Sequence, residues 1–394
     1  MTSKRTGAEL VVRALEDEGI GLAFGIPGTH NIELYDALAA SEKVRAVLVT
    51  DEQSASFMAD AAFRASGRMA CVNVVPGAGL THAMSGIAEA CLDGIPMLVL
   101  GCGIRRDTGK AFQLHDVDQA ALVRPVTKAQ LRPERGEELY RIVRRACLIA
   151  RDGVPGPVFV EVPADHYLFR HEAILEEPWP EPRPALHPDD DVAGTASLLT
   201  KAKRPLLYLG LGAAAAGDNL VALAERLEAP VSTTFQGKGV FPESHPLWLW
   251  PGFGDAAPPF AREVAASCDA TLTIGCRFGE VATGSYGMTP PRPLIHVDID
   301  PDVPGRNYET DLAFSADADA FVRALLTHLP SRRADAELRR DLRDGHEKVE
   351  LELSRPSEGR VGPHLLLRAL QEAFGPETIF TTDSGNGTFL AVEG

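Results

Sequence analysis

The sequence predicts an α/β protein built from doubly wound, mainly parallel sheets. Two observations support this fold class. Short apolar runs alternate with amphipathic helical stretches over residues 5–165, and a second series of the same kind follows a proline-rich segment. Strands that alternate with helices form right-handed βαβ units, in which helices cover both faces of a parallel sheet. We therefore expect more than one such sheet in the chain.

The strands of the first unit are expected where apolar residues run consecutively, because a strand buried on both faces shows no alternation. These runs occupy residues 22–24, 47–49, 71–75, 97–100 and 158–162. By the same criterion, the strands of the second unit are expected at residues 205–209, 230–234, 270–274 and 293–298.

The segment between the two series contains five prolines within residues 176–188. Each proline removes a backbone donor and fixes φ, so this segment is predicted to be an extended linker. The mixed charged stretch 331–355 is predicted to be an exposed helix and connector, followed by a helix at 363–373 and a strand at 378–382. The expected division is residues 1–170, a linker at 171–192, 193–330, a connector at 331–360, and 361–394.

Length and composition narrow the function classes. The chain has 394 residues, 45% of them hydrophobic and 24% charged, with a net charge of −16. This negative charge argues against nucleic acid or an anionic membrane surface as partner, and no apolar run reaches the roughly 20 residues of a membrane span. The six cysteines form no CxxC pair, so neither a disulfide framework nor a zinc site is indicated. We expect a cytoplasmic protein that binds a small molecule.

Three motifs follow strand-like runs in the first unit. The turn Gly25-Ile-Pro-Gly28 follows the first run, Glu52 follows the second and opens a helix, and Pro76-Gly-Ala-Gly79 follows the third. Ligands of α/β proteins bind at the carboxyl ends of parallel strands, which is where these motifs are expected. Taken singly, each has a simpler explanation: the helix dipole favours an acidic residue at a helix start, and glycines serve many βα turns.

In this order, the motifs resemble those of the pyrimidine-binding domain in thiamine diphosphate (thiamine pyrophosphate) enzymes of the acetolactate synthase and 2-oxoacid decarboxylase superfamily. The resemblance implies a pyrimidine-binding domain at residues 1–170, a central Rossmann-like domain at 193–330 and the start of a diphosphate-binding domain at 361–394. It assigns Glu52 to N1′ of the cofactor's aminopyrimidine, where a carboxylate favours the imino tautomer that removes the C2 proton. Pro27 and Gly28 would contact the pyrimidine, and Gly77 and Gly79 would line the cofactor cleft.

The resemblance also suggests further site residues. His115 lies where relatives carry polar residues that reach the substrate, and an imidazole that titrates near neutrality could relay protons. The alternative is a surface histidine beside Asp116 and Asp118; His30 and His82 are weaker candidates. Asn386 and Thr388 would contact the diphosphate.

Some residues depart from the family pattern. Leu114 and His115 stand in place of a Phe-Gln pair typical of acetohydroxyacid synthases, Ala164 in place of a lysine, and Val154 in place of an arginine associated with FAD. These departures argue against FAD. The family holds Mg²⁺ through a Gly-Asp-Gly and Asn-Asn motif, oxygen ligands of the kind that magnesium prefers. This sequence contains no such motif, so no metal ligand is assigned and the chain is expected to be a C-terminally truncated member.

The resemblance implies a lyase or transferase that cleaves or forms a C–C bond next to a carbonyl, either a 2-oxoacid decarboxylase or an acetolactate synthase-like carboligase. It also implies a homodimer or tetramer that uses magnesium and thiamine diphosphate. Two alternatives stay open. The chain could be a non-catalytic or split-subunit protein that pairs with a separate diphosphate-binding subunit, or a nucleotide-dependent oxidoreductase, suggested by Gly210-Leu-Gly212. The particular substrate cannot be inferred from the sequence.

Overall fold

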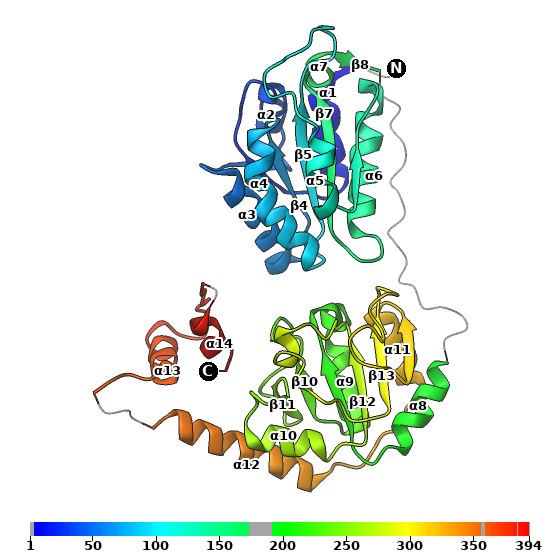
Figure 1. The fold of residues 1–394 in the computed structure, drawn as a ribbon, viewed down its shortest axis with the longest axis vertical. Coiled ribbons are helices and arrows are strands. Elements are labelled where there is room, and N and C mark those ends of the chain that lie inside the picture. Colours follow the sequence, from blue (N-terminus) through cyan, green and yellow to red (C-terminus); the bar gives the residue numbers. More distant parts are fainter. Residues whose placement is uncertain (1–3, 173–190, 356–358, 384, 394) are drawn as a thin grey trace. The chain divides into compact units, whose positions relative to one another are not determined.

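The computed structural model describes residues 4–172, 191–355, 359–383 and 385–393 (Figure 1). The chain divides into two compact units, Met1–Arg183 and Pro184–Gly394. Most of the expected linker, residues 171–192, lies outside the described residues. The finer division into a central domain, a connector and a third domain stays a prediction.

The first unit is built on a six-stranded sheet in the order β3-β2-β4-β5-β7-β6, and every neighbouring pair is parallel. The predicted α/β class with parallel sheets is therefore confirmed. The strands are β2 (Leu22–Gly25), β3 (Arg45–Leu48), β4 (Ala70–Val74), β5 (Met97–Gly103), β6 (Ala129–Leu131) and β7 (Pro157–Pro163). A two-residue antiparallel pair, β1 (Arg5–Thr6) with β8 (Arg170–His171), lies apart from this sheet.

Helices cover both faces of this sheet (Figure 1). Leu98 and Val99 are consecutive in β5 and therefore point to opposite faces. Leu98 belongs to a core cluster that includes α1 and α6 residues, whereas Val99 belongs to one with α3 and α4 residues. The helices are α1 (Gly7–Asp17), α2 (Ile32–Ala39), α3 (Glu52–Ser66), α4 (Ala78–Leu92), α5 (Gln119–Val123), η1 (Arg124–Val126), η2 (Gly136–Glu138), α6 (Leu139–Arg151) and α7 (Ala164–Leu168).

The second unit contains another parallel six-stranded sheet, in the order β11-β10-β9-β12-β13-β14. Its strands are β9 (Pro205–Leu209), β10 (Val231–Thr233), β11 (Trp248–Pro251), β12 (Ala270–Ile274), β13 (Leu294–Asp298) and β14 (Leu312–Ser315). Its helices are α8 (Val192–Lys201), η3 (Leu211–Ala216), α9 (Asp218–Leu227), α10 (Pro259–Ala266), η4 (Val281–Thr283) and α11 (Ala318–His328). The edge strands β11 and β14 were not expected from the sequence.

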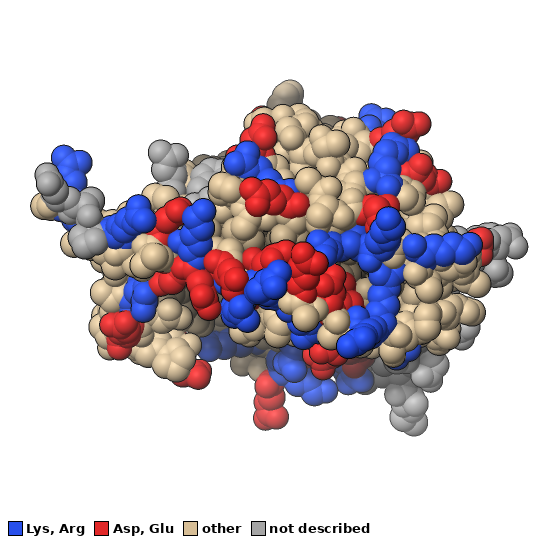
Figure 2. Space-filling model, turned by 90° about the horizontal axis from the view of Figure 1, so that it is seen from below, with Lys and Arg blue, Asp and Glu red and all other residues tan. Residues whose placement is uncertain are grey.

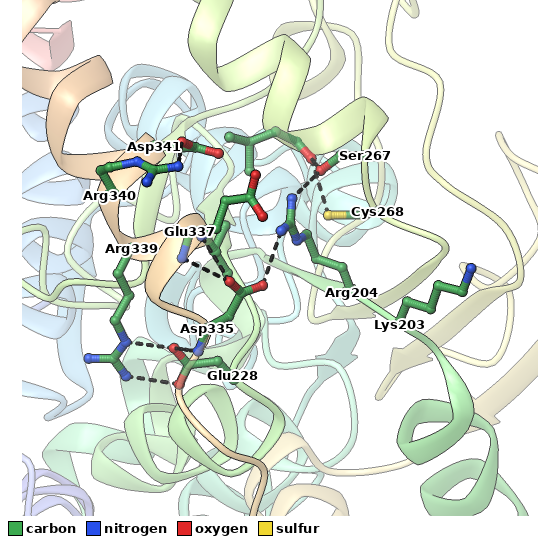
Figure 3. A network of polar contacts seen from close by, with 12 residues as sticks. Lys203, Arg204, Glu228, Ser267, Cys268, Asp335, Glu337, Arg339, Arg340 and Asp341 are labelled. Atoms are coloured by element: carbon green, nitrogen blue, oxygen red, sulfur yellow. Dashed lines mark hydrogen bonds and ion pairs between the residues drawn. The ribbon is translucent and has the colours of Figure 1, made fainter.

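The long helix α12 (Ala336–Leu353) lies within the charged stretch predicted to be helical. The start of this helix is attached to the rest of the second unit by the polar network of Figure 3. Glu228 accepts two hydrogen bonds from Arg339, at 2.6 and 2.9 Å, and Arg204 pairs with Asp335 at 3.0 Å. Acidic and basic side chains are interspersed on the face shown in Figure 2, as expected for a solvated surface of mixed charge.

The predicted strand at 378–382 is wrong, because these residues form no strand in the structure. A strand needs a hydrogen-bonded neighbour, and neither parallel sheet has one next to this segment. Ile379 is 89% exposed. The predicted helix at 363–373 is present as α13 (Pro363–Phe374), and α14 (Asn386–Glu393) follows. None of the helices in the described residues is long and apolar enough to cross a membrane.

Candidate functional site

The motifs of the first unit meet at the carboxyl edge of its sheet. Gly25 ends β2, Glu52 begins α3 just after β3, and Gly77 precedes α4 just after β4. Because β3, β2 and β4 are consecutive in the sheet, the turns that follow them are neighbours. This is the edge at which α/β proteins bind ligands.

Gly79 lets the start of α4 approach Glu52. A Cβ atom at Gly79 would lie 3.2 Å from Oε1 of Glu52 and 2.8 Å from Cγ2 of Val75. The Glu52 side chain is 13% exposed, and its Oε2 lies 3.7 Å from Nδ1 of His82, which is 63% exposed. The carboxylate is thus largely buried where the start of α4 passes close to it, at the edge of the sheet at which α/β proteins bind ligands.

The turn after β2 is held by a buried asparagine that the sequence analysis missed. Asn31 is fully buried; its Oδ1 accepts from the Gly28 amide at 2.6 Å, and its Nδ2 donates to the Ile26 carbonyl at 3.3 Å. A Cβ at Gly28 would lie 2.6 Å from Cγ1 of Val75, so this turn packs closely on the turn after β4. An asparagine three residues after the glycine of a tight turn is the signal that could have revealed it.

His115 lies against the glycine-rich turn after β4. Its Nδ1 is 2.9 Å from the Pro76 carbonyl, and its ring centroid is 5.9 Å from that of His30. Burial and the neighbouring His115 lower the pKa of His30 below its usual value. His115 is itself exposed and lines a shallow hollow with Gly77, Ala78, Thr81 and Asp116. The structure therefore brings the histidine next to the predicted site and leaves its outer face open to solvent.

The magnesium ion of the expected cofactor needs oxygen ligands, and the potential metal ligands of the first unit can be compared with this requirement. Among the described residues, one group of potential metal ligands lies close together: Asp51, Glu52 and His82, whose ligand atoms are within 4.8 Å of one another. This set includes an imidazole and lies at Glu52, whereas magnesium prefers oxygen ligands. No group of three or more potential ligands with oxygen atoms alone lies this close together among the described residues. The binding of thiamine diphosphate by Glu52 and its neighbours stays a prediction.

The two residues expected at the diphosphate lie in the second unit. Asn386 begins α14, and the Thr388 hydroxyl contacts the Thr382 hydroxyl at 2.6 Å and the Asp383 carbonyl. These contacts stay within one short segment. The role of both residues toward the cofactor stays a prediction.

The Gly210-Leu-Gly212 turn of the second unit serves backbone packing. The Gly210 amide donates to the Ile274 carbonyl at 3.0 Å, and the Gly212 amide donates to the Gly275 carbonyl at 3.1 Å. A Cβ at Gly212 would lie 2.9 Å from Cα of Gly275. Amides that bind protein carbonyls are not available to a phosphate, so this turn gives no support to the dinucleotide-dependent alternative.

Two family profiles match separate parts of the chain. The family profile described as "Thiamine pyrophosphate enzyme, N-terminal TPP binding domain" matches residues 5–122, and "Thiamine pyrophosphate enzyme, central domain" matches residues 192–325. The chain belongs to the thiamine pyrophosphate enzyme family. The expected family is thus confirmed, and the two matches fall in separate structural units.

Within this family, the chain is similar to proteins named as acetolactate synthase large subunits. The one from Parasynechococcus marenigrum is 32% identical over 98% of this chain and 65% of the relative. The probable one from Methanocaldococcus jannaschii is 35% identical over 82% of this chain and 56% of the relative. The isozyme 3 large subunit from Escherichia coli is 30% identical over 98% of this chain and 69% of the relative. The chain thus spans about two thirds or less of the length of these relatives.

Proposed function

We propose that this chain supplies the pyrimidine-binding and central domains of a thiamine diphosphate-dependent enzyme that cleaves or forms a C–C bond next to a carbonyl. The observation that carries the proposal is the position of Glu52, a largely buried carboxylate at the ligand-binding edge of the sheet, closely approached by Gly79 at the start of α4. The substrate class is a 2-oxoacid or a related carbonyl compound. The similarity to acetolactate synthase large subunits supports carboligation, a transferase reaction, over simple decarboxylation by a lyase.

The residues of the first unit would act on the cofactor as follows. When bound, the cofactor supplies a carbon acid whose conjugate base attacks the substrate carbonyl. Glu52 would hold N1′ of the aminopyrimidine by a shared proton, and Gly79, which has no side chain, allows the start of α4 to lie close to this carboxylate. Pro27 and Gly28 form the opposite wall, because the turn that contains them packs on Val75. Gly77 keeps the start of α4 in place.

His115 is proposed to transfer protons to and from the substrate. Its Nδ1 can only donate to the Pro76 carbonyl, since a carbonyl oxygen has no proton to give. In the neutral imidazole, this bond leaves the lone pair on Nε2, at the exposed side of the ring. Nε2 is therefore the atom that would accept or return a proton.

A homodimer or tetramer is part of the proposal. Phe57 and Met58 of α3 are 41% and 44% exposed, and Leu48 and Leu92 are 70% and 64% exposed. Large apolar side chains exposed on neighbouring elements favour contact with a second protein surface. In addition, the relatives are named as large subunits, which supports a further partner subunit. A cytoplasmic location stays a prediction of the sequence.

Mg²⁺ would be required at the diphosphate, and FAD is not part of the proposal. A second candidate function is that of a split-subunit or non-catalytic partner, which binds cofactor only together with a separate diphosphate-binding polypeptide. It is favoured by the ligand chemistry, because the described residues assemble no oxygen-only cluster that would suit magnesium.

The test is to measure C2 proton exchange of thiamine diphosphate by NMR with magnesium and the chain, with and without the C-terminal third of the Parasynechococcus relative as a second polypeptide. We expect little binding to the chain alone, and binding with accelerated exchange once the second polypeptide is added. Glu52→Gln should then slow exchange by on the order of 10²-fold.

Glu42→Gln is the matched control, because Glu42 is an exposed glutamate of the same unit. Exchange that is equally fast in Glu52→Gln and Glu42→Gln at full occupancy would remove Glu52 from the mechanism. Turnover of a 2-oxoacid by the complemented pair distinguishes the enzyme from the non-catalytic partner.

A further inference from the structure

A buried glutamine joins the two elements that border the candidate site. Gln119 begins α5 and is 2% exposed. Its Nε2 donates to the Cys102 carbonyl at the end of β5, at 2.8 Å, and its Oε1 accepts from the Gly77 amide, at 3.3 Å. One side-chain amide thus ties the carboxyl end of β5 to the turn that starts α4, with its donor and its acceptor both used.

The Pro76–Gly77 peptide group is held at both of its polar atoms. His115 binds the Pro76 carbonyl at 2.9 Å, and Gln119 binds the Gly77 amide. These two atoms belong to the same planar peptide group, so fixing both sets the orientation of the plane. Gly77 has φ +68°, a left-handed conformation that a rotated plane would not preserve.

The orientation of this peptide matters to Glu52. Gly79, two residues further on, is the position at which the start of α4 lies close to Glu52, because a Cβ there would be 3.2 Å from Oε1. A rotation of the preceding peptide would move the first turn of α4 relative to Glu52. The contacts from residues 115 and 119 therefore control how closely this turn approaches the carboxylate.

Gln119 is supported in turn by a buried carboxylate. Glu161 of β7 is 7% exposed, and its Oε1 pairs with Nη2 of Arg132 at 3.2 Å. Burial raises the pKa of Glu161, while Arg132 and a hydrogen bond from Gln119 act in the opposite direction. A polar cluster that includes Arg132 and Glu161 thus lies beside Gln119, which itself contacts Gly77.

We propose that Gln119 is a positioning residue for the cofactor: together with His115 it fixes the Pro76–Gly77 peptide, and through it the position of Gly79 next to Glu52. The role toward the cofactor rests on the proposed function, whereas the fixing of the peptide does not. Substituting Gln119 should therefore affect the turn even when no cofactor is present.

The first measurement is amide hydrogen exchange of the full chain, followed by mass spectrometry of the peptide that contains residues 77–81. Gln119→Ala should raise its exchange about 10-fold, the scale expected for one lost buried hydrogen-bond partner. Gln130→Ala is the matched control, because the side chain of Gln130 in β6 donates its hydrogen bonds to Thr127, away from the turn at residues 76–79. Equal exchange in the two variants would overturn the proposal.

Gln119→Glu tests the hydrogen-bond pattern itself, because it makes the bond to the Cys102 carbonyl depend on pH. The introduced carboxyl can accept from the Gly77 amide, but it can donate to the Cys102 carbonyl only when it is protonated. Exchange of residues 77–81, relative to wild type at each pH, should therefore approach one at low pH and rise as the carboxyl ionises. The titratable group next to this position is Glu161, on which Arg132, Asp118 and Asp116 also act. A ratio independent of pH would contradict the proposed hydrogen-bond pattern.

The second measurement is the affinity of the complemented pair for thiamine diphosphate and magnesium. Gln119→Ala should weaken binding about 10-fold, and Gln119→Glu should weaken it only at the higher pH. Altered exchange with unchanged affinity would show that the peptide is fixed but does not position the cofactor. If wild type binds no cofactor, the proposed function and the role of Gln119 in it fail together, while the exchange data still decide whether the peptide is fixed.

Discussion

A buried ion pair connects the first and last large helices of the first unit, and its removal should destabilise that unit strongly. Glu18, at the end of α1, accepts from Nε of Arg144 at 2.8 Å and from Nη1 of Arg151 at 2.9 Å. The side chains of Glu18 and Arg144 are 9% and 1% exposed. Glu18→Gln keeps the shape of the side chain but removes the charge that compensates a buried guanidinium.

The expected cost follows from this burial. Removing one partner of a buried pair typically costs about 3–5 kcal/mol, because the other charge stays buried. Arg144 keeps a hydrogen bond to the Tyr140 hydroxyl at 3.3 Å and an electrostatic interaction with Asp17, so the lower end of this range applies. For a unit of this size, a loss of about 3 kcal/mol should lower the midpoint of thermal unfolding by about 6–12 °C.

Thermal unfolding of the full chain, followed by circular dichroism and calorimetry, measures the shift. Asp107→Asn is the control, because its partner Arg105 is 47% exposed and such surface pairs contribute little. The double variant Glu18→Leu/Arg144→Met should recover part of the stability, since apolar residues can replace the buried Glu18–Arg144 pair. Arg151 loses the carboxylate as well, but its side chain is 24% exposed and keeps its hydrogen bond to the carbonyl of residue 18. A midpoint for Glu18→Gln that matches the Asp107→Asn control would refute this reasoning.

Three further predictions concern packing, acid stability and thiol reactivity. A Cβ at Gly86 would collide with Ser56 and lie 2.8 Å from the Phe57 amide nitrogen. Gly86→Ala should therefore lower the free energy of unfolding in urea by about 1–3 kcal/mol. An unchanged midpoint would contradict close packing of α3 on α4. The Leu294 amide and Arg292 lower the pKa of Asp311. Its contribution is therefore present above the unfolded-state pKa of about 4 and lost as the pH falls through the folded-state value, and Asp311→Asn should flatten this part of the pH–stability curve. Burial raises the pKa values of Cys268 and Cys276 to about 12. A thiol reagent at about pH 8 should therefore modify half-exposed Cys91 first. Rapid modification of Cys268 or Cys276 in the folded chain would contradict this order of reactivity.

Much of the fold follows from local patterns. The run at 97–100 consists entirely of apolar residues, and β5 occupies it because only a strand covered on both faces buries every residue. Glu52 and the glycine motifs could be placed at the ligand-binding edge for the same reason, since the end of a buried strand is visible in the sequence. Strands β6, β11 and β14 were missed because short edge strands show weak periodicity and depend on a neighbour for their hydrogen bonds.

The sequence by itself determined the class of fold, the family and the position of Glu52 at a strand end, because these depend on residues close together along the chain. Only the tertiary structure revealed the contacts that shape the site. Gln119 reaches Gly77 across 42 positions of sequence, and Gly79 faces Glu52 from a different helix. The structure also rejected a strand at 378–382, whose apolar pattern is suitable but whose backbone has no partner there. Hydrogen bonds between distant segments exist only once the chain has folded, so no local pattern contains them.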